Sequence, residues 1–190
     1  MTPSVLIPLA QGCEELEAVT LIDLLRRAKI EVVTAGLDNN LVTASRGTVL
    51  QPDTTLDKVD SQLFTMIALP GGQPGANHLG DDPRIIELLQ TFYHQGKYIA
   101  AICAAPKVLA RAGLLRGKKA TSFPGSLSAA ELEGVDYVEH SIVHDGTIIT
   151  SRGPGTAMDF ALYLIELLLD RGRRDQVEQA LQRGSLIHNA

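Results

Sequence analysis

The 190-residue sequence is poor in the features that mark several classes of protein. It has no tryptophan, 4% aromatic residues and two cysteines, Cys13 and Cys103. Two cysteines cannot build a disulfide framework, so we expect a cytoplasmic protein with reduced thiols. No apolar run approaches the length of a membrane-spanning helix, and the first residues lack the charged and apolar regions of a signal peptide.

Positive charge and metal-ligand clusters are also scarce. The chain carries 17 Lys and Arg against 22 Asp and Glu, a formal net charge of -5. This balance predicts neither nucleic acid nor a membrane surface as a partner. His140 and His144 are four residues apart, but their segment is typical of a strand and lacks further ligands, so we expect no metal and no cofactor.

What the sequence does contain is a regular alternation of elements, with 45% apolar residues and no linker, which predicts one domain over residues 1–190. Strand patterns cover residues 5–9, 30–35, 66–69, 98–103, 119–121, 137–143 and 147–150, with a hairpin or edge strands at 41–44 and 48–50. Helix patterns cover residues 14–28, 82–93, 104–115, 128–133, 159–169 and 175–181. The alternation predicts an α/β fold, a doubly wound and mostly parallel sheet with helices on both faces.

Cys103 ends an apolar strand pattern, and a helix pattern starts directly after it. A thiol on such a turn resembles the nucleophile elbow of serine hydrolases. The first N–H groups of the helix stabilise negative charge, so we expect the pKa of this thiol to lie below its free value. The alternative is a small buried cysteine of the core.

Two other segments also reach the carboxyl ends of strands, where doubly wound domains bind ligands. Glu17 lies near the apolar face of its helix, so burial would raise its pKa and let it donate a hydrogen bond to sulfur. The Gly71-Gly72 pair either makes a tight turn or presents a backbone N–H to an oxyanion. Cys13 either fills space at a helix start or is an accessory thiol.

Four segments together resemble a known family: residues 10–19, 69–72, 100–106 and 150–156 are similar, in order and spacing, to motifs of the ThiJ/PfpI superfamily, in its DJ-one-like (YajL-like) branch. The resemblance implies a flavodoxin-like fold, related to class I glutamine amidotransferases, and a homodimer. It implies that Cys103 is the reactive cysteine, with Glu17 as its carboxyl partner and the N–H groups of Gly72 and Ala104 as an oxyanion pocket. It places Arg46 near the site or the dimer contact, paired with Glu14.

Two departures from the wider family bear on mechanism. Ala104 follows the cysteine where the peptidase-like branch has histidine, which counts against a protease. Phe123 stands where some members carry a histidine, so proton transfer would fall to Glu17 or to water. Three functions follow from the resemblance: cysteine-dependent handling of methylglyoxal, glyoxal or their glycated adducts, redox sensing in oxidative stress, and chaperone-like binding.

Overall fold

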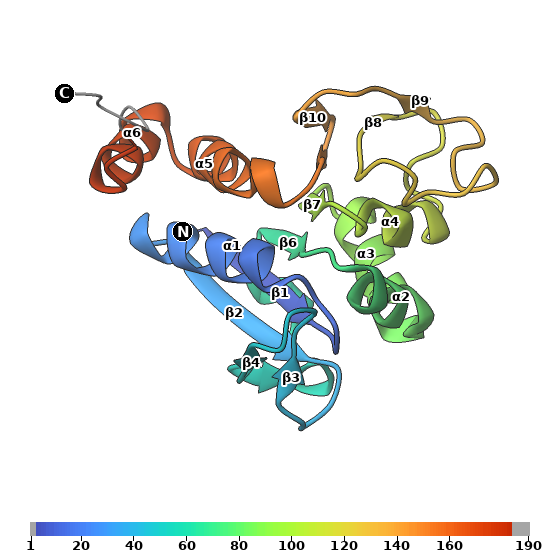
Figure 1. Cartoon of the computed structure of the whole chain (residues 1–190), viewed down its shortest axis with the longest axis horizontal. Helices are drawn as coiled ribbons and strands as arrows, with labels where there is room; N and C mark the ends of the chain where they lie inside the picture. The colour runs from blue at the N-terminus through green and yellow to red at the C-terminus, as the bar shows by residue number, and fades with distance from the viewer. Residues whose placement is uncertain (1–2, 184–190) are drawn as a thin grey trace.

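The computed structural model describes residues 3–183, and a mostly parallel sheet runs through this part of the chain (Figure 1). Its strand order is β10-β11-β7-β6-β1-β2-β5. Neighbouring strands pair in parallel except β10 and β11, which form an antiparallel hairpin at one edge. The strands are β1 (Ser4–Leu9), β2 (Glu31–Gly36), β5 (Thr54–Thr55), β6 (Met66–Leu69), β7 (Tyr98–Ile102), β10 (Ile142–Asp145) and β11 (Ile148–Ser151).

Helices cover both faces of this sheet. On one face α1 packs against α5 and α5 against α6, and on the other α2, α3 and α4 pack together (Figure 1). The chain moves from β1 toward β2 through α1, but from β6 in the opposite direction toward β7 through α2 and α3. Right-handed crossovers that run in opposite directions place their helices on opposite faces. The helices are α1 (Glu15–Arg27), α2 (Gln73–Asp81), α3 (Pro83–His94), α4 (Pro106–Arg111), α5 (Ala157–Leu168) and α6 (Arg171–Ala180).

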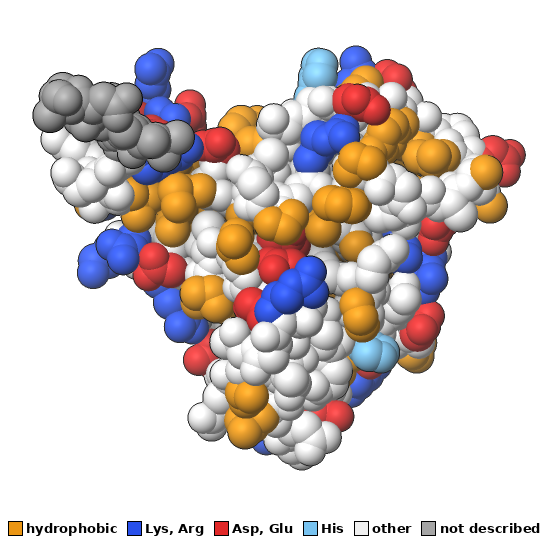
Figure 2. Space-filling view, viewed as in Figure 1, with side chains coloured by type: hydrophobic (Ala, Val, Ile, Leu, Met, Phe, Trp, Pro, Cys, Tyr) orange, Lys and Arg blue, Asp and Glu red, His pale blue; other side chains and the backbone are white. Residues whose placement is uncertain are grey.

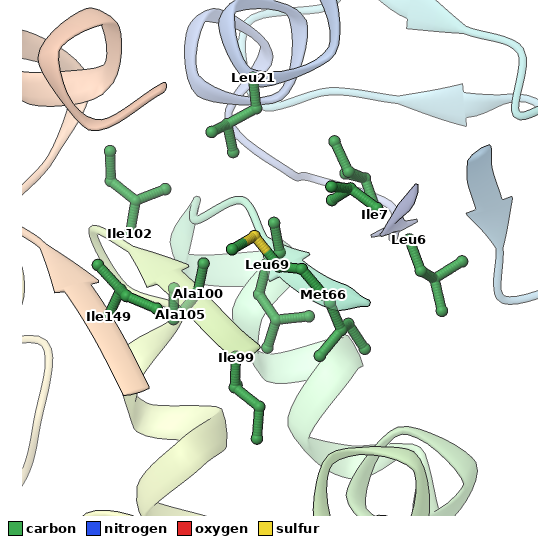
Figure 3. Close-up of a cluster of buried hydrophobic side chains, with 14 of the residues drawn as sticks. Leu6, Ile7, Leu21, Met66, Leu69, Ile99, Ala100, Ile102, Ala105 and Ile149 are labelled. Atoms are coloured by element: carbon green, nitrogen blue, oxygen red, sulfur yellow. The ribbon is translucent and has the colours of Figure 1, made fainter. Parts of the chain in front are cut away.

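The core lies on both sides of the three central strands. Each residue of β1 and β6 is buried, and β7 is buried after its first residue. Strands covered on both faces are apolar throughout rather than alternating, which is why β1 and β6 read as continuous apolar runs. Figure 3 shows Leu6, Met66 and Ile99 among the side chains of this cluster.

The centre of the sheet contains the point where the winding direction reverses. β1 and β6 are neighbours, yet the connections that follow them leave in opposite directions. The loops after these two strands meet at the carboxyl edge, the usual ligand position in doubly wound folds, and the Glu14 N–H donates to Gly71 O at 2.9 Å. A small antiparallel hairpin, β3 (Val42–Thr43) with β4 (Val49–Leu50), lies near this edge, and a second small ladder joins β8 (Lys119–Ala120) to β9 (Asp136–Tyr137).

The expected fold class is confirmed, and the differences concern individual elements. Helix α2 was not expected, because Pro74, Gly75 and Gly80 weaken the helical pattern of this segment. Residues 128–133 form turns instead of a helix, since they bury no apolar face and the Glu131 carboxylate accepts from the N–H and hydroxyl of Ser128. Helix α4 ends at Arg111 rather than at 115, and residues 138–141 interrupt the strand expected over 137–143.

Candidate active site

Cys103 occupies a strained turn between β7 and α4. Its φ is 64°, in the left-handed region that residues other than glycine rarely adopt. Two hydrogen bonds hold the turn: the Cys103 N–H donates to Ser151 O at 3.0 Å, and the Phe123 N–H donates to Cys103 O at 2.8 Å. Strain that neighbouring segments maintain in this way is typical of functional positions. The structure therefore favours the nucleophile elbow over an inert core cysteine.

Glu17 approaches the elbow from the first turn of α1. Its side chain is fully buried, and the Gly71 N–H donates to its Oε2 at 2.8 Å, whereas its Oε1 makes no hydrogen bond of regular geometry. Burial raises the pKa of Glu17 to about 7, although hydrogen bonds from Gly71 and with the Cys103 side chain oppose the increase. At neutral pH this carboxyl therefore exists in both its protonated and its ionised form.

Gly71 allows the carboxyl and the cysteine to come together. A Cβ atom at this position would lie 2.6 Å from Cys103 Cβ and 2.7 Å from Glu17 Oε2. Any side chain here would push the two groups apart. The next residue, Gly72, has a φ of 89°, which also favours glycine.

The sequence predicts a lowered pKa for Cys103, but in the structure the pKa of this thiol is raised. Burial, followed by the charge of an ionised Glu17 and its hydrogen bond, raises the pKa of the thiol to about 12, while the N–H groups of Gly72 and Ala104 act in the opposite direction. The helix N-terminus favours the thiolate less than burial disfavours it, since α4 is short and begins three residues after the cysteine. Because two adjacent negative charges are unfavourable, the thiolate forms far more readily while Glu17 is protonated.

A cavity of about 260 Å³ opens onto Cys103. The described residues that line it include no histidine, and Phe123 occupies its wall with a half-exposed ring. It is lined by Glu14, Ser45, Arg46, Gly72, Gln73, Pro74, Cys103, Ala104, Phe123, Ser126 and Pro154. A larger cleft of about 540 Å³ lies between the β2–β3 loop and the start of α3, but Cys103 does not line it. The smaller cavity is therefore the candidate site.

Within one copy of the chain, the Arg46 guanidinium donates to Ser45 O at 3.3 Å and does not pair with Glu14. The Glu14 carboxylate instead caps α1, accepting from the Glu17 N–H at 2.9 Å. The backbone N–H of Arg46 donates to both oxygens of Glu15 at 2.9 and 3.0 Å, and the Ser45 hydroxyl donates to the same carboxylate. Although desolvation opposes it, these hydrogen bonds lower the pKa of Glu15 to about 2. Glu15 thus anchors the loop that brings Arg46 to the cavity.

A carboxylate in the first turn of a helix usually only complements the helix dipole, so the sequence does not single out Glu15 as a residue of the site. No local signal identifies its partner, since the loop it binds lies about thirty residues further along the chain. The same holds for Gln73, which lies on the unexpected helix α2 and lines the cavity.

Cys13 does not reach the cavity. Its side chain is fully buried, and its N–H donates to Ala10 O at 3.0 Å. Gly75 packs directly on its backbone, since a Cβ there would lie 2.6 Å from Cys13 Cα. Burial and the charge of Glu15 raise the pKa of Cys13 to about 11.

Over residues 3–183, no group of three or more His, Cys, Asp or Glu side chains is arranged to hold a metal ion. In the same part of the chain, no helix combines the length and apolar character needed to cross a membrane.

A doubly wound sheet with a strained cysteine after a central strand and a buried carboxyl beside it defines a class of flavodoxin-like proteins related to class I glutamine amidotransferases. The profile of the DJ-1/PfpI family matches residues 3–167, and the chain belongs to this family. It is 43% identical to "Protein dj-1beta" of Drosophila melanogaster over 183 residues, covering 95% of this chain and 97% of that protein. The crystal structure of Drosophila DJ-1beta superposes with a TM-score of 0.92 at 42% identity, covering 97% of this chain and 100% of that one.

Two further relatives show how the family varies in length and in assigned activity. The chain is 42% identical to "Protein DJ-1 homolog B" of Arabidopsis thaliana, covering 94% of this chain but 41% of that longer protein. It is 35% identical to the "Glutathione-independent glyoxalase DJR-1.2" of Caenorhabditis elegans, covering 86% of this chain and 87% of that protein.

Proposed function

We propose that this protein is a cysteine-dependent enzyme for reactive 1,2-dicarbonyl compounds, acting on methylglyoxal and glyoxal or on their glycated adducts. The observation that carries the proposal is the placement of the strained Cys103 beside Glu17, whose pKa is raised to about 7, at the mouth of a small cavity. The Caenorhabditis relative is named a glyoxalase that is independent of glutathione. This name supports a mechanism in which a cysteine of the protein takes the place of the glutathione thiol.

The arrangement suits addition of the thiol to an aldehyde. The Cys103 thiolate adds to the aldehyde carbon of methylglyoxal, and the oxygen that gains the charge lies within reach of the Gly72 and Ala104 N–H groups. Glu17 gives its proton to this oxygen, which completes a hemithioacetal. Because no histidine among residues 3–183 lines the cavity, general-base catalysis at neutral pH is assigned to Glu17.

The remaining steps conserve atoms and electrons. Ionised Glu17 takes the proton from the former aldehyde carbon, an enediol forms, and a proton returns to the neighbouring carbon. The product is a thioester of lactate on Cys103. Water then breaks the carbon–sulfur bond, which releases lactate and restores the thiol, so the net reaction is methylglyoxal plus water to lactate. With a glycated amine or thiol as substrate, the free amine or thiol is the second product.

The test is a steady-state assay of lactate formation from methylglyoxal, with Cys103→Ser as the matched variant. We expect turnover by the wild-type chain and none above background by Cys103→Ser. A second arm uses glycated amine and thiol substrates, with buffer-only reactions as controls, because adducts reverse spontaneously and imitate deglycation. Equal lactate formation by both proteins would overturn the proposal.

The second candidate is a redox sensor, in which Cys103 is oxidised rather than turned over. It is favoured by the 8% exposure of Cys103 toward the cavity and by a Glu17 that is still partly protonated at neutral pH. A protonated carboxyl can donate a hydrogen bond to the oxygens of a sulfinic acid. Reaction of Cys103 with peroxide in a protein that does not convert dicarbonyls would support this alternative. Chaperone-like activity that survives loss of Cys103 would favour a third function, chaperone-like binding in which the cysteine takes no part.

A second copy of the chain is part of the proposal. Leu16 and Val19 of α1 and Met158 of α5 are 50%, 44% and 37% exposed, and Figure 2 shows hydrophobic side chains gathered over these two helices. Apolar patches of this kind are typical of interaction surfaces. Light scattering should therefore give about twice the 20.4 kDa mass of one chain. A monomer at micromolar concentration would contradict the dimer.

A further inference from the structure

Lys107 is a buried cation that the proposed mechanism does not use. It lies on α4, four residues after Cys103, and is 8% exposed. Its ammonium donates to Gln73 Oε1 at 3.2 Å and to Asn77 Oδ1 at 3.0 Å, both on α2. These two acceptors are neutral amide oxygens, and no carboxylate lies within salt-bridge distance of Lys107 among residues 3–183. Burying an ammonium without a contacting anion is costly, which suggests a role beyond packing.

The chemistry of the ammonium fixes the orientation of Gln73. An ammonium group donates hydrogen bonds and cannot accept them, so Gln73 must present its oxygen to Lys107. The amide nitrogen, Nε2, then points away from Lys107 with both of its hydrogens available. Gln73 is an exposed residue and lines the same cavity as Cys103, directly after Gly72 in the sequence.

We propose that Gln73 is a substrate-binding residue for the second carbonyl group of a 1,2-dicarbonyl, and that Lys107 is the positioning residue that orients it. This inference rests on the proposed function. While Cys103 attacks the aldehyde carbon, the Gln73 Nε2 hydrogens donate to the oxygen on the adjacent carbon. A monoaldehyde lacks that oxygen, so this contact favours dicarbonyl substrates over simple aldehydes.

The oxygen that Gln73 contacts is the one that gains negative charge when the enediol forms, which predicts the kinetic signature of this contact. A hydrogen bond that strengthens in the transition state contributes to kcat/KM through kcat as well as KM. The loss of one hydrogen bond corresponds to a decrease in kcat/KM of about tenfold.

Two variants test the roles separately. Gln73→Glu keeps an acceptor for Lys107 as an ion pair but removes the donor, so kcat/KM for methylglyoxal should fall about tenfold or more without loss of thermal stability. Lys107→Met removes the orienting cation, and we expect a decrease in kcat/KM of about fivefold with the alkylation rate of Cys103 unchanged. The double variant should show less than the product of the two effects, because Lys107 acts through Gln73.

The matched control is Lys97→Met. Lys97 is a half-buried lysine that also donates to a neutral oxygen, Ser61 O at 2.8 Å, but it lies at the amino edge of the sheet. The Lys97→Met variant should keep the kcat/KM of the wild type for methylglyoxal. Alkylation of Cys103 by iodoacetamide, followed by peptide mass spectrometry, checks that Lys107→Met leaves the elbow intact, and its rate should stay within about twofold of wild type.

The outcomes separate the two proposals. If the wild-type chain forms no lactate from methylglyoxal, the proposed function fails. If the wild-type chain is active but Gln73→Glu keeps its kcat/KM, the assignment of Gln73 is overturned. If Lys107→Met keeps its kcat/KM, or lowers kcat/KM together with the alkylation rate, the positioning role of Lys107 is overturned.

Discussion

The two cysteines of this chain share several properties and differ in the ones that matter for chemistry. Both are buried, both are free thiols, and burial raises the pKa of each, to about 11 for Cys13 and about 12 for Cys103. Cys103 has a φ of 64° and opens onto a cavity, whereas Cys13 has no positive φ and is fully enclosed. The carboxyl groups beside the two cysteines also differ. Glu17, beside Cys103, can be neutral near pH 7, whereas Glu15, beside Cys13, stays ionised.

The comparison shows that burial and the direction of the pKa do not identify a reactive thiol. A backbone strained to aim the side chain, an opening to substrate and a partner that can carry the proton distinguish Cys103. Cys13 has none of these.

The largest effect should come from removing each thiol in turn. Cys103→Ala should lower kcat/KM for methylglyoxal about a thousandfold or more, because no other thiol among the described residues lines the cavity. Cys13→Ala should change kcat/KM less than about twofold, since its side chain does not reach the cavity. The measurement is lactate formation at pH 7. A comparable loss in both variants would show that the two thiols act together.

The second prediction concerns stability and pH. Folding raises the pKa of Glu17 from 4.5 to about 7, so between these values the folded chain holds a proton that the unfolded chain has lost. The stabilisation is complete below pH 4.5 and is lost as the pH rises through about 7. The loss amounts to about 3 kcal/mol in the free energy of unfolding.

Urea unfolding of the wild type and of Glu17→Gln over this pH range measures the effect. The glutamine amide accepts from the Gly71 N–H as the carboxylate does and carries no charge. Its stability curve should therefore be flatter than that of the wild type. Parallel curves for the two proteins would show that Glu17 does not titrate in this range.

The third prediction concerns the coupling of Glu17 to Cys103. In the wild type, alkylation of Cys103 should rise with pH in two steps, near 7 as the pair loses its first proton and near 12 as it loses the second. In Glu17→Gln the rate should show one step between these values, because the charge that opposes the thiolate is gone. Site-resolved mass spectrometry after iodoacetamide treatment provides the rates. Identical profiles would indicate that the groups do not interact.

The sequence predicts those parts of the fold and site that depend on local pattern. The buried strands β1 and β6 and the elbow at Cys103 are readable, because continuous apolar runs and an abrupt change of period mark them. Helix α2 is not readable, since tertiary contact at Gly75 selects residues that weaken a helix. The pKa of Cys103 also depends on burial by distant segments, which no local pattern contains.

The residues of the site also fall into two groups, those that local sequence pattern predicts and those that depend on contacts between distant segments. Glu17 and Gly72 were identified because they follow strands that end at one edge of the sheet, and the resemblance to a family named their roles. The loop held by Glu15 and the amide held by Lys107 join segments about thirty residues apart. These contacts depend on how α1 packs against the loop that carries Arg46 and how α2 packs against α4, and no local sequence pattern predicts either arrangement.

The smallest effect separates the two thiols by oxidation rather than by turnover. Mild peroxide should modify Cys103 before Cys13, because Cys103 is 8% exposed toward a cavity and Cys13 is fully enclosed. The product at Cys103 should stop largely at the sulfinic acid, since a protonated Glu17 can donate a hydrogen bond to its oxygens.

Glu17→Asp shortens the reach of that carboxyl without changing its charge, so it should alter how far Cys103 is oxidised while the domain stays folded. Peptide mass spectrometry over a peroxide series assigns each added oxygen to one cysteine, and circular dichroism monitors folding. If Cys13 is oxidised first, or if the two cysteines join in a disulfide, then enclosure does not protect Cys13. In that event the difference in access between the two thiols would not explain their reactivity.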